Sequence, residues 1–273
     1  MMTATNVSEA AKAAALPDAV RAAVRDLILV LADSKRLLGT RYAEWILGAP
    51  ELEAGIACAS MSQDEWGHGR LLYALLRDFG DEVDRIEHGR DPAEYRSMGV
   101  LDAPPASWPE LVALNALADL ALTVQLEALR GSSYLPLRQR VQKLLEEEQF
   151  HAAHGAAWLR RLGRGGGPAR DAAATAVRGL LSAVLQWFGP DSASARALLE
   201  AGIVDAAGSS LRARYLERAA PLLGELDADD ALTGVENDFS RFDEASRRVS
   251  GTAPDPATIA RVRGDKNRAF LMD

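Results

Sequence analysis

Apolar residues recur at three- and four-residue steps along most of the chain, which is the period of an amphipathic helix with one face on a core. The first such segment runs from Pro17 to about Gly48. Its repeating apolar positions are Val24, Ile28, Leu31, Leu38, Tyr42 and Trp45. Gly48 and Pro50 then interrupt the pattern. The sequence therefore predicts one long helix near the start of the chain.

Three further long helices are predicted. The second spans about 51–79 and ends at Gly80, the third spans about 109–131, and the fourth spans about 134–162. Between the second and the third, residues 80–107 show no sustained period and contain several prolines, so we expect a long connection there. Two helix pairs joined by a long crossover are typical of ferritin-like four-helix bundles. The predicted fold is therefore all-α and ferritin-like.

The rest of the chain divides into three predicted parts around the bundle of residues 17–162. Residues 1–16 are expected to form a flexible N-terminus. A glycine-rich break at 163–168 opens a region, 163–226, of additional helices that pack on the bundle or serve an interface. Those helices are predicted at about 169–187, 192–206 and 209–224. Residues 227–273 are expected to form a polar, irregular tail.

Composition narrows the class of protein. A net charge of −8 and a pI near 5.2 argue against a nucleic-acid-binding face, which needs clustered Lys and Arg. The single cysteine, Cys58, excludes a disulfide framework and a cysteine-based metal site. The longest strongly apolar run, residues 27–32, is far shorter than the roughly 20 residues that cross a bilayer. The N-terminus lacks a secretory signal pattern. We therefore expect a soluble, cytoplasmic protein with neither nucleic acid nor membrane as a partner.

Two of the four histidines lie in the same short motif. The predicted second helix contains Glu65 and His68, and the predicted fourth helix contains Glu148 and His151, each pair spaced as Glu-x-x-His. The three-residue step places a carboxylate and an imidazole on one face of a helix. Two such motifs on facing helices of a bundle form the arrangement that binds a pair of iron or manganese ions.

Both motifs interrupt apolar stripes of their helices. Met61 and Leu72 share a face with the first motif, and Leu144 shares a face with the second. Buried carboxylates persist only when they are paired or bound to a metal. A buried ion-pair network without metal is the alternative to a metal site. Of the other two histidines, His88 is expected to be solvated, and His154 to lie behind the ligands or at the surface.

The first and third helices supply the remaining groups. On the third helix Asp119 lies on the apolar stripe, whereas Glu127 lies on another face. On the first helix the position that faces the bundle is Lys35, one of only four lysines against 27 arginines. The nearby carboxylates, Asp33 and Glu44, fall off that stripe. The predicted site therefore combines three carboxylates, two histidines and a lysine.

Charge counting on these groups argues against an empty site. Three carboxylates carry three negative charges, and a protonated Lys35 leaves two of them uncompensated in a low-dielectric interior. One divalent metal together with Lys35 as an ammonium gives a net charge of zero. Two divalent metals with a neutral, ligating Lys35 leave one positive charge, which a bridging hydroxide would cancel. The charge count favours a bound metal and does not decide between one ion and two.

These motifs resemble those of the phenylacetic acid catabolic family, the ferritin-like subunits of a phenylacetyl-CoA epoxidase. Residues 63–69 (Gln-Asp-Glu-Trp-Gly-His-Gly) and 147–151 (Glu-Glu-Gln-Phe-His) are similar to metal-binding helices of the catalytic subunit. By contrast, residues 37–45 resemble the first helix of the structural, non-catalytic subunit. The resemblance covers about residues 25–225.

The resemblance implies a ligand set. Carried over position by position, the metal ligands fall on Glu65, His68, Asp119, Glu148 and His151. The remaining ligand position, a glutamate in the catalytic subunit, falls on Lys35. The implied metal is iron, as two ions, with one ion or manganese as alternatives. Lys35 would then be a ligand, a counter-charge, or a catalytic group that delivers protons.

The implied function is that of a non-haem di-iron oxygenase, which activates dioxygen to oxygenate an aromatic or unsaturated substrate such as an aromatic acyl-CoA. Electrons would come from a separate reductase, because the chain has no glycine-rich dinucleotide motif. Family members associate as homo- or hetero-oligomers.

Two other functions stay open. One is a structural subunit that scaffolds a catalytic partner without turnover of its own. Lys35 and the structural-type first helix favour this function, and the two intact Glu-x-x-His motifs oppose it. The other is a stand-alone oxidase of a biosynthetic pathway, because a fold does not fix a substrate.

Overall fold

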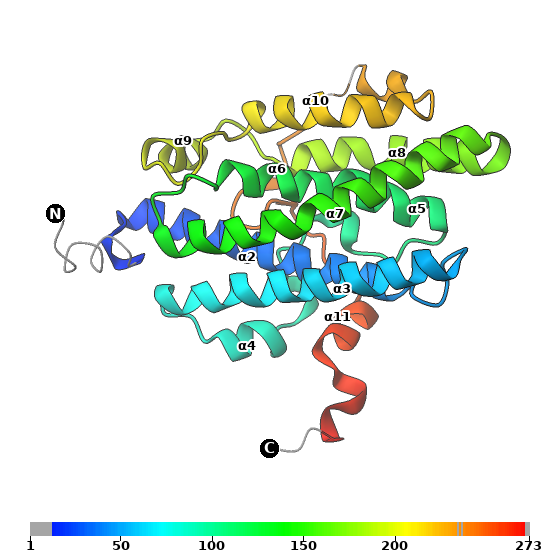
Figure 1. Cartoon of the computed structure of the whole chain (residues 1–273). Coiled ribbons are helices and arrows are strands. Elements are labelled where there is room, and N and C mark those ends of the chain that lie inside the picture. The colour runs from blue at the N-terminus through cyan, green and yellow to red at the C-terminus, as the bar shows by residue number, and fades with distance from the viewer. Residues whose placement is uncertain (1–12, 234, 236, 271–273) are drawn as a thin grey trace.

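The computed structural model describes residues 13–233, 235 and 237–270, and helices make up most of this part of the chain (Figure 1). Four long helical segments form a bundle. They are α2 (Asp18–Ala43), α3 (Leu52–Tyr73), a composite third segment and α7 (Leu135–Gly165). The third segment consists of α5 (Trp108–Ala113), the π-helical turn η5 (Leu114–Asp119) and α6 (Leu120–Ala128). The predicted all-α, ferritin-like bundle with a crossover between its second and third helices is confirmed.

Shorter elements precede the bundle, form its crossover and cover it. Before α2 lies the turn η1 (Ala13–Ala15). The crossover contains η2 (Ala74–Phe79), α4 (Val83–His88), η3 (Pro92–Glu94) and η4 (Gly99–Leu101). After the bundle come α8 (Gly167–Trp187), α9 (Ala193–Glu200), α10 (Ser209–Gly224) and η6 (Asp229–Leu232). α8 packs on α5 and α7, α9 on α2, and α10 on α6. The break between α7 and α8 falls at Gly166, whose backbone φ of +61° favours glycine.

The last part of the chain is more regular than the predicted irregular tail. It forms a two-stranded antiparallel hairpin, β1 (Phe242–Asp243) and β2 (Arg248–Val249), followed by α11 (Pro256–Arg263) and η7 (Asp265–Phe270). Side chains anchor these elements to the bundle. Arg248 pairs with Asp102 of the crossover at 2.5 Å, and Arg41 of α2 donates to Thr258 of α11 at 3.1 Å. These partners are distant in the sequence, so periodicity did not reveal them. The N-terminal flexibility predicted for residues 1–16 mostly concerns residues 1–12, which lie outside the described part.

The third segment of the bundle is its core helix. Residues Trp108–Ala128 are long and apolar enough to cross a membrane by length and composition, but they are almost entirely buried by the surrounding protein. Burial within the bundle therefore accounts for the apolar character of this segment. Asn115, Asp119 and Gln125 are buried polar residues on it.

A buried ion pair holds the crossover on α2. Both carboxylate oxygens of Asp33 accept hydrogen bonds from the guanidinium of Arg90, and Tyr73 of α3 donates to the same carboxylate at 2.5 Å. The backbone N–H of Arg96 adds a further bond at 2.7 Å. Arg90 also lies over the ring of Tyr95, with its guanidinium carbon 4.3 Å from the ring centroid. We call this group the Asp33 cluster.

Candidate metal centre

All five predicted ligands meet in the interior of the bundle. α3 supplies Glu65 and His68, α7 supplies Glu148 and His151, and the end of the π-helical turn supplies Asp119. Each of these residues is at most 2% exposed. The same-face spacing of each Glu-x-x-His motif therefore delivers both of its side chains to one place, as the sequence predicted.

Lys35 of α2 lies at the centre of the three carboxylates. Its Nζ donates to Glu65 Oε1 at 2.8 Å, to Asp119 Oδ1 at 2.8 Å and to Glu148 Oε1 at 2.6 Å. All three N–H bonds of an ammonium are thus used, and the side chain is completely buried. We call Lys35 and the five predicted ligands the Lys35 cluster.

The two histidines point one nitrogen inward and one outward. His151 Nδ1 lies 3.2 Å from both Glu65 Oε1 and Asp119 Oδ2, and His68 Nδ1 lies 3.1 Å from Glu148 Oε1. The outward nitrogens contact half-exposed carboxylates: His68 Nε2 lies 2.6 Å from Glu147, and His151 Nε2 lies 3.4 Å from Asp64. A carboxylate on the far nitrogen of a histidine fixes its orientation and its tautomer.

Asp64 and Glu147 were missed by the sequence analysis, although a signal existed. Each is the acidic residue directly before the glutamate of one motif, and each reaches the histidine of the other motif. The two motifs are therefore reciprocally linked across the α3–α7 contact. The extended pattern, an acid followed by Glu-x-x-His, occurs in both helices.

Three more polar side chains orient the carboxylates. Tyr42 of α2 donates to Asp119 Oδ2 at 2.9 Å, and Asn115 donates to the Tyr42 hydroxyl at 2.9 Å. Thr123, one turn after Asp119, donates to Glu148 Oε2 at 2.9 Å. Tyr42 lies on the apolar stripe of the first helix, yet its hydroxyl role could not be deduced from the stripe.

The π-helical turn sets the position of Asp119. A π turn widens the helix by one residue, and such turns are frequent at functional sites. Asn115 lies in this turn and also donates to the backbone oxygen of His151 at 3.2 Å. The close approach requires Gly155 on α7, because a Cβ there would lie 2.8 Å from Asn115 Oδ1. Regular helical periodicity did not predict this local widening.

The donor set fits a metal ion. Ligand atoms of Glu65, Asp119, Glu148 and His151 lie within 4.8 Å of one another, and all four residues are buried. Carboxylate oxygens and imidazole nitrogens are ligands that iron, manganese and zinc accept. Glu65 Oε2 and His68 Nδ1 are buried without a hydrogen-bond partner among the described residues. Unpaired buried polar atoms of this kind are expected where a cation binds.

The protonation of the histidines corrects the charge count made from the sequence. Burial lowers the pKa of His68, but the nearby carboxylates of Glu148 and Glu65 outweigh burial and raise the pKa to about 10. Burial also lowers the pKa of His151, but its hydrogen bonds with Asp119 and Glu65 outweigh burial and raise the pKa to about 11. Without metal, Lys35 and both histidines are therefore cationic, and three positive charges face three carboxylates. The sequence count took both histidines as neutral, so its argument against a metal-free site was wrong.

The pKa values of the carboxylates that share Lys35 are shifted in different directions. Burial works to raise the pKa of Asp119, but the Lys35 ammonium outweighs it and holds that pKa well below the usual range. In Glu148, burial and the neighbouring Asp119 charge prevail over Lys35, so its pKa is raised. The positive and negative charges of the cluster therefore balance as a whole, and Glu148 is the carboxylate that is most easily protonated.

Other titratable residues considered from the sequence lie outside the cluster. Glu127 pairs with Arg218, and Glu44 pairs with Arg41. His154 is half-buried and lies 3.1 Å from Asn115 Oδ1, behind the ligands. His88, on the crossover, is half-exposed.

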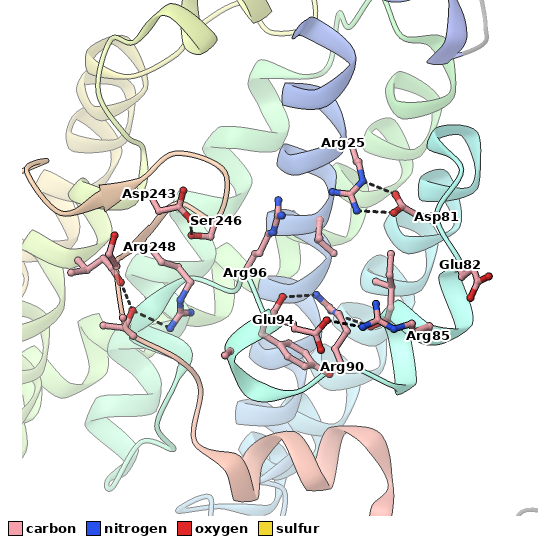
Figure 2. Close-up of a pocket in the computed structure, with 18 of the residues that line it drawn as sticks. Arg25, Asp81, Glu82, Arg85, Arg90, Glu94, Arg96, Asp243, Ser246 and Arg248 are labelled. Carbon is pink, nitrogen blue, oxygen red and sulfur yellow. Dashed lines mark hydrogen bonds and ion pairs between the residues drawn. The ribbon is translucent and has the colours of Figure 1, made fainter. Parts of the chain in front are cut away.

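A cavity of about 670 Å³ lies away from the cluster, between α2, the crossover and the hairpin (Figure 2). Five arginines line it, but each is already paired with a carboxylate. Arg25 binds Asp81 through two nitrogens at 2.6 and 2.7 Å, and Arg85 binds Glu94 at 2.9 Å. Arg90, Arg96 and Arg248 pair with Asp33, Asp26 and Asp102. This compensation removes the excess positive charge that an anion site would need.

A helical bundle with two reciprocal Glu-x-x-His motifs around a buried cluster defines a carboxylate–histidine centre. Residues 2–231 match the model of the family described as phenylacetic acid catabolic protein, so the chain belongs to this family. The resemblance recognised from the motifs is confirmed.

Two relatives from Escherichia coli (strain K12) are similar to the chain, and both are components of 1,2-phenylacetyl-CoA epoxidase. The first component is 26% identical over 236 residues, which cover 84% of this chain and 76% of the relative. The second component is 30% identical over 140 residues, which cover 50% of this chain and 56% of the relative. The similarity supports an oxygenase role at the level of the family.

Proposed function

We propose that this chain is a metal-binding subunit of an oxygenase, which uses iron and dioxygen to oxygenate an aromatic or unsaturated substrate. The observation that carries the proposal is the convergence of three carboxylates and two histidines, from three helical segments, in one buried cluster. A protein without metal chemistry gains little from such a set, because buried charges cost stability unless they are paired.

The residues of the cluster would hold the metal and shield it. Glu65, His68, Asp119, Glu148 and His151 are the candidate ligands. When bound, iron supplies the reduction of dioxygen, which no side chain of the protein provides. Tyr42 and Thr123 fix the carboxylates in place, and the apolar residues around the cluster keep water away from it. Lys35, whose three N–H groups bind the carboxylates, would hold these candidate ligands in place and keep a positive charge beside the metal.

The remaining parts of the proposal rest on the family. An aromatic acyl-CoA is the proposed substrate, because both relatives are named as subunits of a phenylacetyl-CoA epoxidase. We propose a separate reductase as electron donor, a homo- or hetero-oligomeric assembly with related subunits, and a cytoplasmic location. Two iron ions are the count implied by the family, and the position of Lys35 bears on that number.

A second candidate function has its own supporting observation. Lys35 occupies the space between the three carboxylates, and protonated histidines make the metal-free cluster neutral. Such a cluster is stable without metal and suits a scaffold subunit that supports a catalytic partner.

Oxygen consumption by the iron-loaded protein tests the proposal. The protein is incubated anaerobically with ferrous iron, freed of excess metal, and mixed with dioxygen and ascorbate, which supplies the two electrons, in the presence and absence of phenylacetyl-CoA. We expect oxygen uptake at a rate that depends on bound iron, and a product heavier by one oxygen atom. The Glu148→Gln variant, which keeps the shape of a ligand and removes its charge, should lose both. Bound iron that consumes no oxygen with either sample would favour the scaffold.

A further inference from the structure

The oxygens of the three carboxylates are used unequally. Lys35 takes one oxygen from each of Glu65, Asp119 and Glu148. Of the second oxygens, Asp119 Oδ2 accepts from Tyr42, and Glu148 Oε2 accepts from Thr123. Glu65 Oε2 is buried and has no hydrogen-bond partner in the described part of the chain. Lys35, Tyr42 and Thr123 together therefore leave one carboxylate oxygen of the cluster unused.

The two histidines differ in the same way. His151 Nδ1 is engaged by Glu65 Oε1 and Asp119 Oδ2, each at 3.2 Å. His68 Nδ1 is buried and forms no hydrogen bond with any described residue. It lies 3.7 Å from the unused Glu65 Oε2 and 3.1 Å from Glu148 Oε1. The two potential ligand atoms without a hydrogen bond, Glu65 Oε2 and His68 Nδ1, thus lie together on the His68 side of the cluster.

The outer contact of His68 prepares it as a ligand. Its Nε2 lies 2.6 Å from Glu147, the shorter of the two outer histidine contacts. When Nε2–H donates to that carboxylate, the lone pair of a neutral imidazole is on Nδ1, which faces the cluster. His68 therefore combines an inward nitrogen without a partner with a fixed orientation.

Charge limits the number of ions that can join Lys35. Three carboxylates, the Lys35 ammonium and one divalent ion give a net charge of zero, to which a protonated His151 adds one positive charge. A second divalent ion beside the Lys35 ammonium would add two more positive charges to a fully buried site, which is costly. A lysine that keeps its three hydrogen bonds is thus compatible with one ion.

We propose that the cluster binds a single divalent metal ion, on the His68 side between Glu65 Oε2, His68 Nδ1 and Glu148, while the Lys35 ammonium takes the place of a second ion. This inference rests on the proposed metal-binding function and narrows it. Glu147 positions His68, and His151 stays bonded to Glu65 and Asp119 rather than to metal.

Cobalt(II) binding to the whole chain tests this arrangement, with metal content and visible absorption as readouts. We expect about one cobalt ion per wild-type chain. His68→Ala should weaken binding by at least about 100-fold, beyond the usual loss for an outer partner. The matched variant His151→Ala should change it by less than about tenfold. Lys35→Glu, which adds a sixth ligand, should raise the content to two ions. His68→Gln serves if His68→Ala fails to fold, as judged by circular dichroism.

The outcomes separate the inference from the proposed function. Two ions bound to the wild-type chain, or one ion lost with His151→Ala and kept with His68→Ala, would overturn the inference and leave a metal-binding subunit. No bound ion in the wild-type chain would overturn both.

Discussion

Two buried ion clusters lie on α2, around residues only two positions apart. In the Asp33 cluster, one carboxylate meets one guanidinium, a tyrosine hydroxyl and a backbone N–H. In the Lys35 cluster, one ammonium meets three carboxylates. The first is complete with its own partners, whereas the second balances only when both histidines are protonated or a metal is bound. The same physics of buried charge therefore yields a structural clamp in one case and a cation site in the other.

The largest expected effect on stability comes from loss of the Asp33–Arg90 ion pair. Arg90→Leu leaves the Asp33 carboxylate buried without its charge partner, and breaking a buried pair typically costs about 3–5 kcal/mol. We expect that decrease in the free energy of unfolding in urea, and no recovery on addition of divalent metal. A decrease below about 1 kcal/mol would show that the crossover does not depend on this pair.

Lys35→Met should destabilise the metal-free protein to a similar extent and be rescued by metal. Its three carboxylates lose their ammonium, and the buried negative charge that remains is costly, about 3–5 kcal/mol. Because a divalent ion supplies the missing charge, saturating manganese should restore most of the stability. Thermal unfolding with manganese or with EDTA measures the difference. If manganese does not restore the stability of Lys35→Met, as we expect for Arg90→Leu, the Lys35 cluster has no cation site.

The stability of the metal-free protein should fall as the pH rises. The pKa values of His68 and His151, about 10 and about 11, are raised above the value of about 6.5 for an unfolded chain. The folded state then holds more protons, so the stabilisation is fully present below about pH 6.5 and is lost as the pH rises through 10 and 11. The free energy of unfolding therefore decreases with pH between the unfolded and the folded pKa values of the two histidines.

Urea unfolding between pH 6 and pH 9 in EDTA measures this slope. Saturating metal should reduce this slope, since His68 loses its proton when it binds the metal. A metal-free protein whose stability does not change over this range would show that the histidines are neutral.

The smallest effect concerns the outer carboxylates. Glu147→Gln removes the negative charge on the 2.6 Å contact to His68, so we expect metal affinity to fall by about 10–100-fold. Asp64→Asn is the matched control, because its contact to His151 is longer, at 3.4 Å, and it should have less effect. Isothermal titration with cobalt(II) compares the two. Equal losses would contradict the asymmetry between the histidines.

The sequence predicted the bundle and the convergence of Glu65, His68, Asp119, Glu148 and His151, because helical spacing decides which side chains share a face. It also predicted that Lys35 faces the site. It missed Glu147 and Asp64, since an acidic residue one position off the buried face usually points to solvent. It could not pair Asp33 with Arg90, because the partner lies 57 residues away in a segment without periodicity. Asn115 was missed because the π-helical turn shifts the helical period.

The iron content of the whole chain tests the central claim most directly. After anaerobic incubation with ferrous iron and removal of excess metal, mass spectrometry measures iron per chain in the wild type and in Glu148→Gln. The Lys35 cluster as described predicts about one iron ion per wild-type chain and a large loss in the variant. A wild-type chain without iron, as stable and folded as before, would contradict a metal centre and identify the cluster as a neutral ion network.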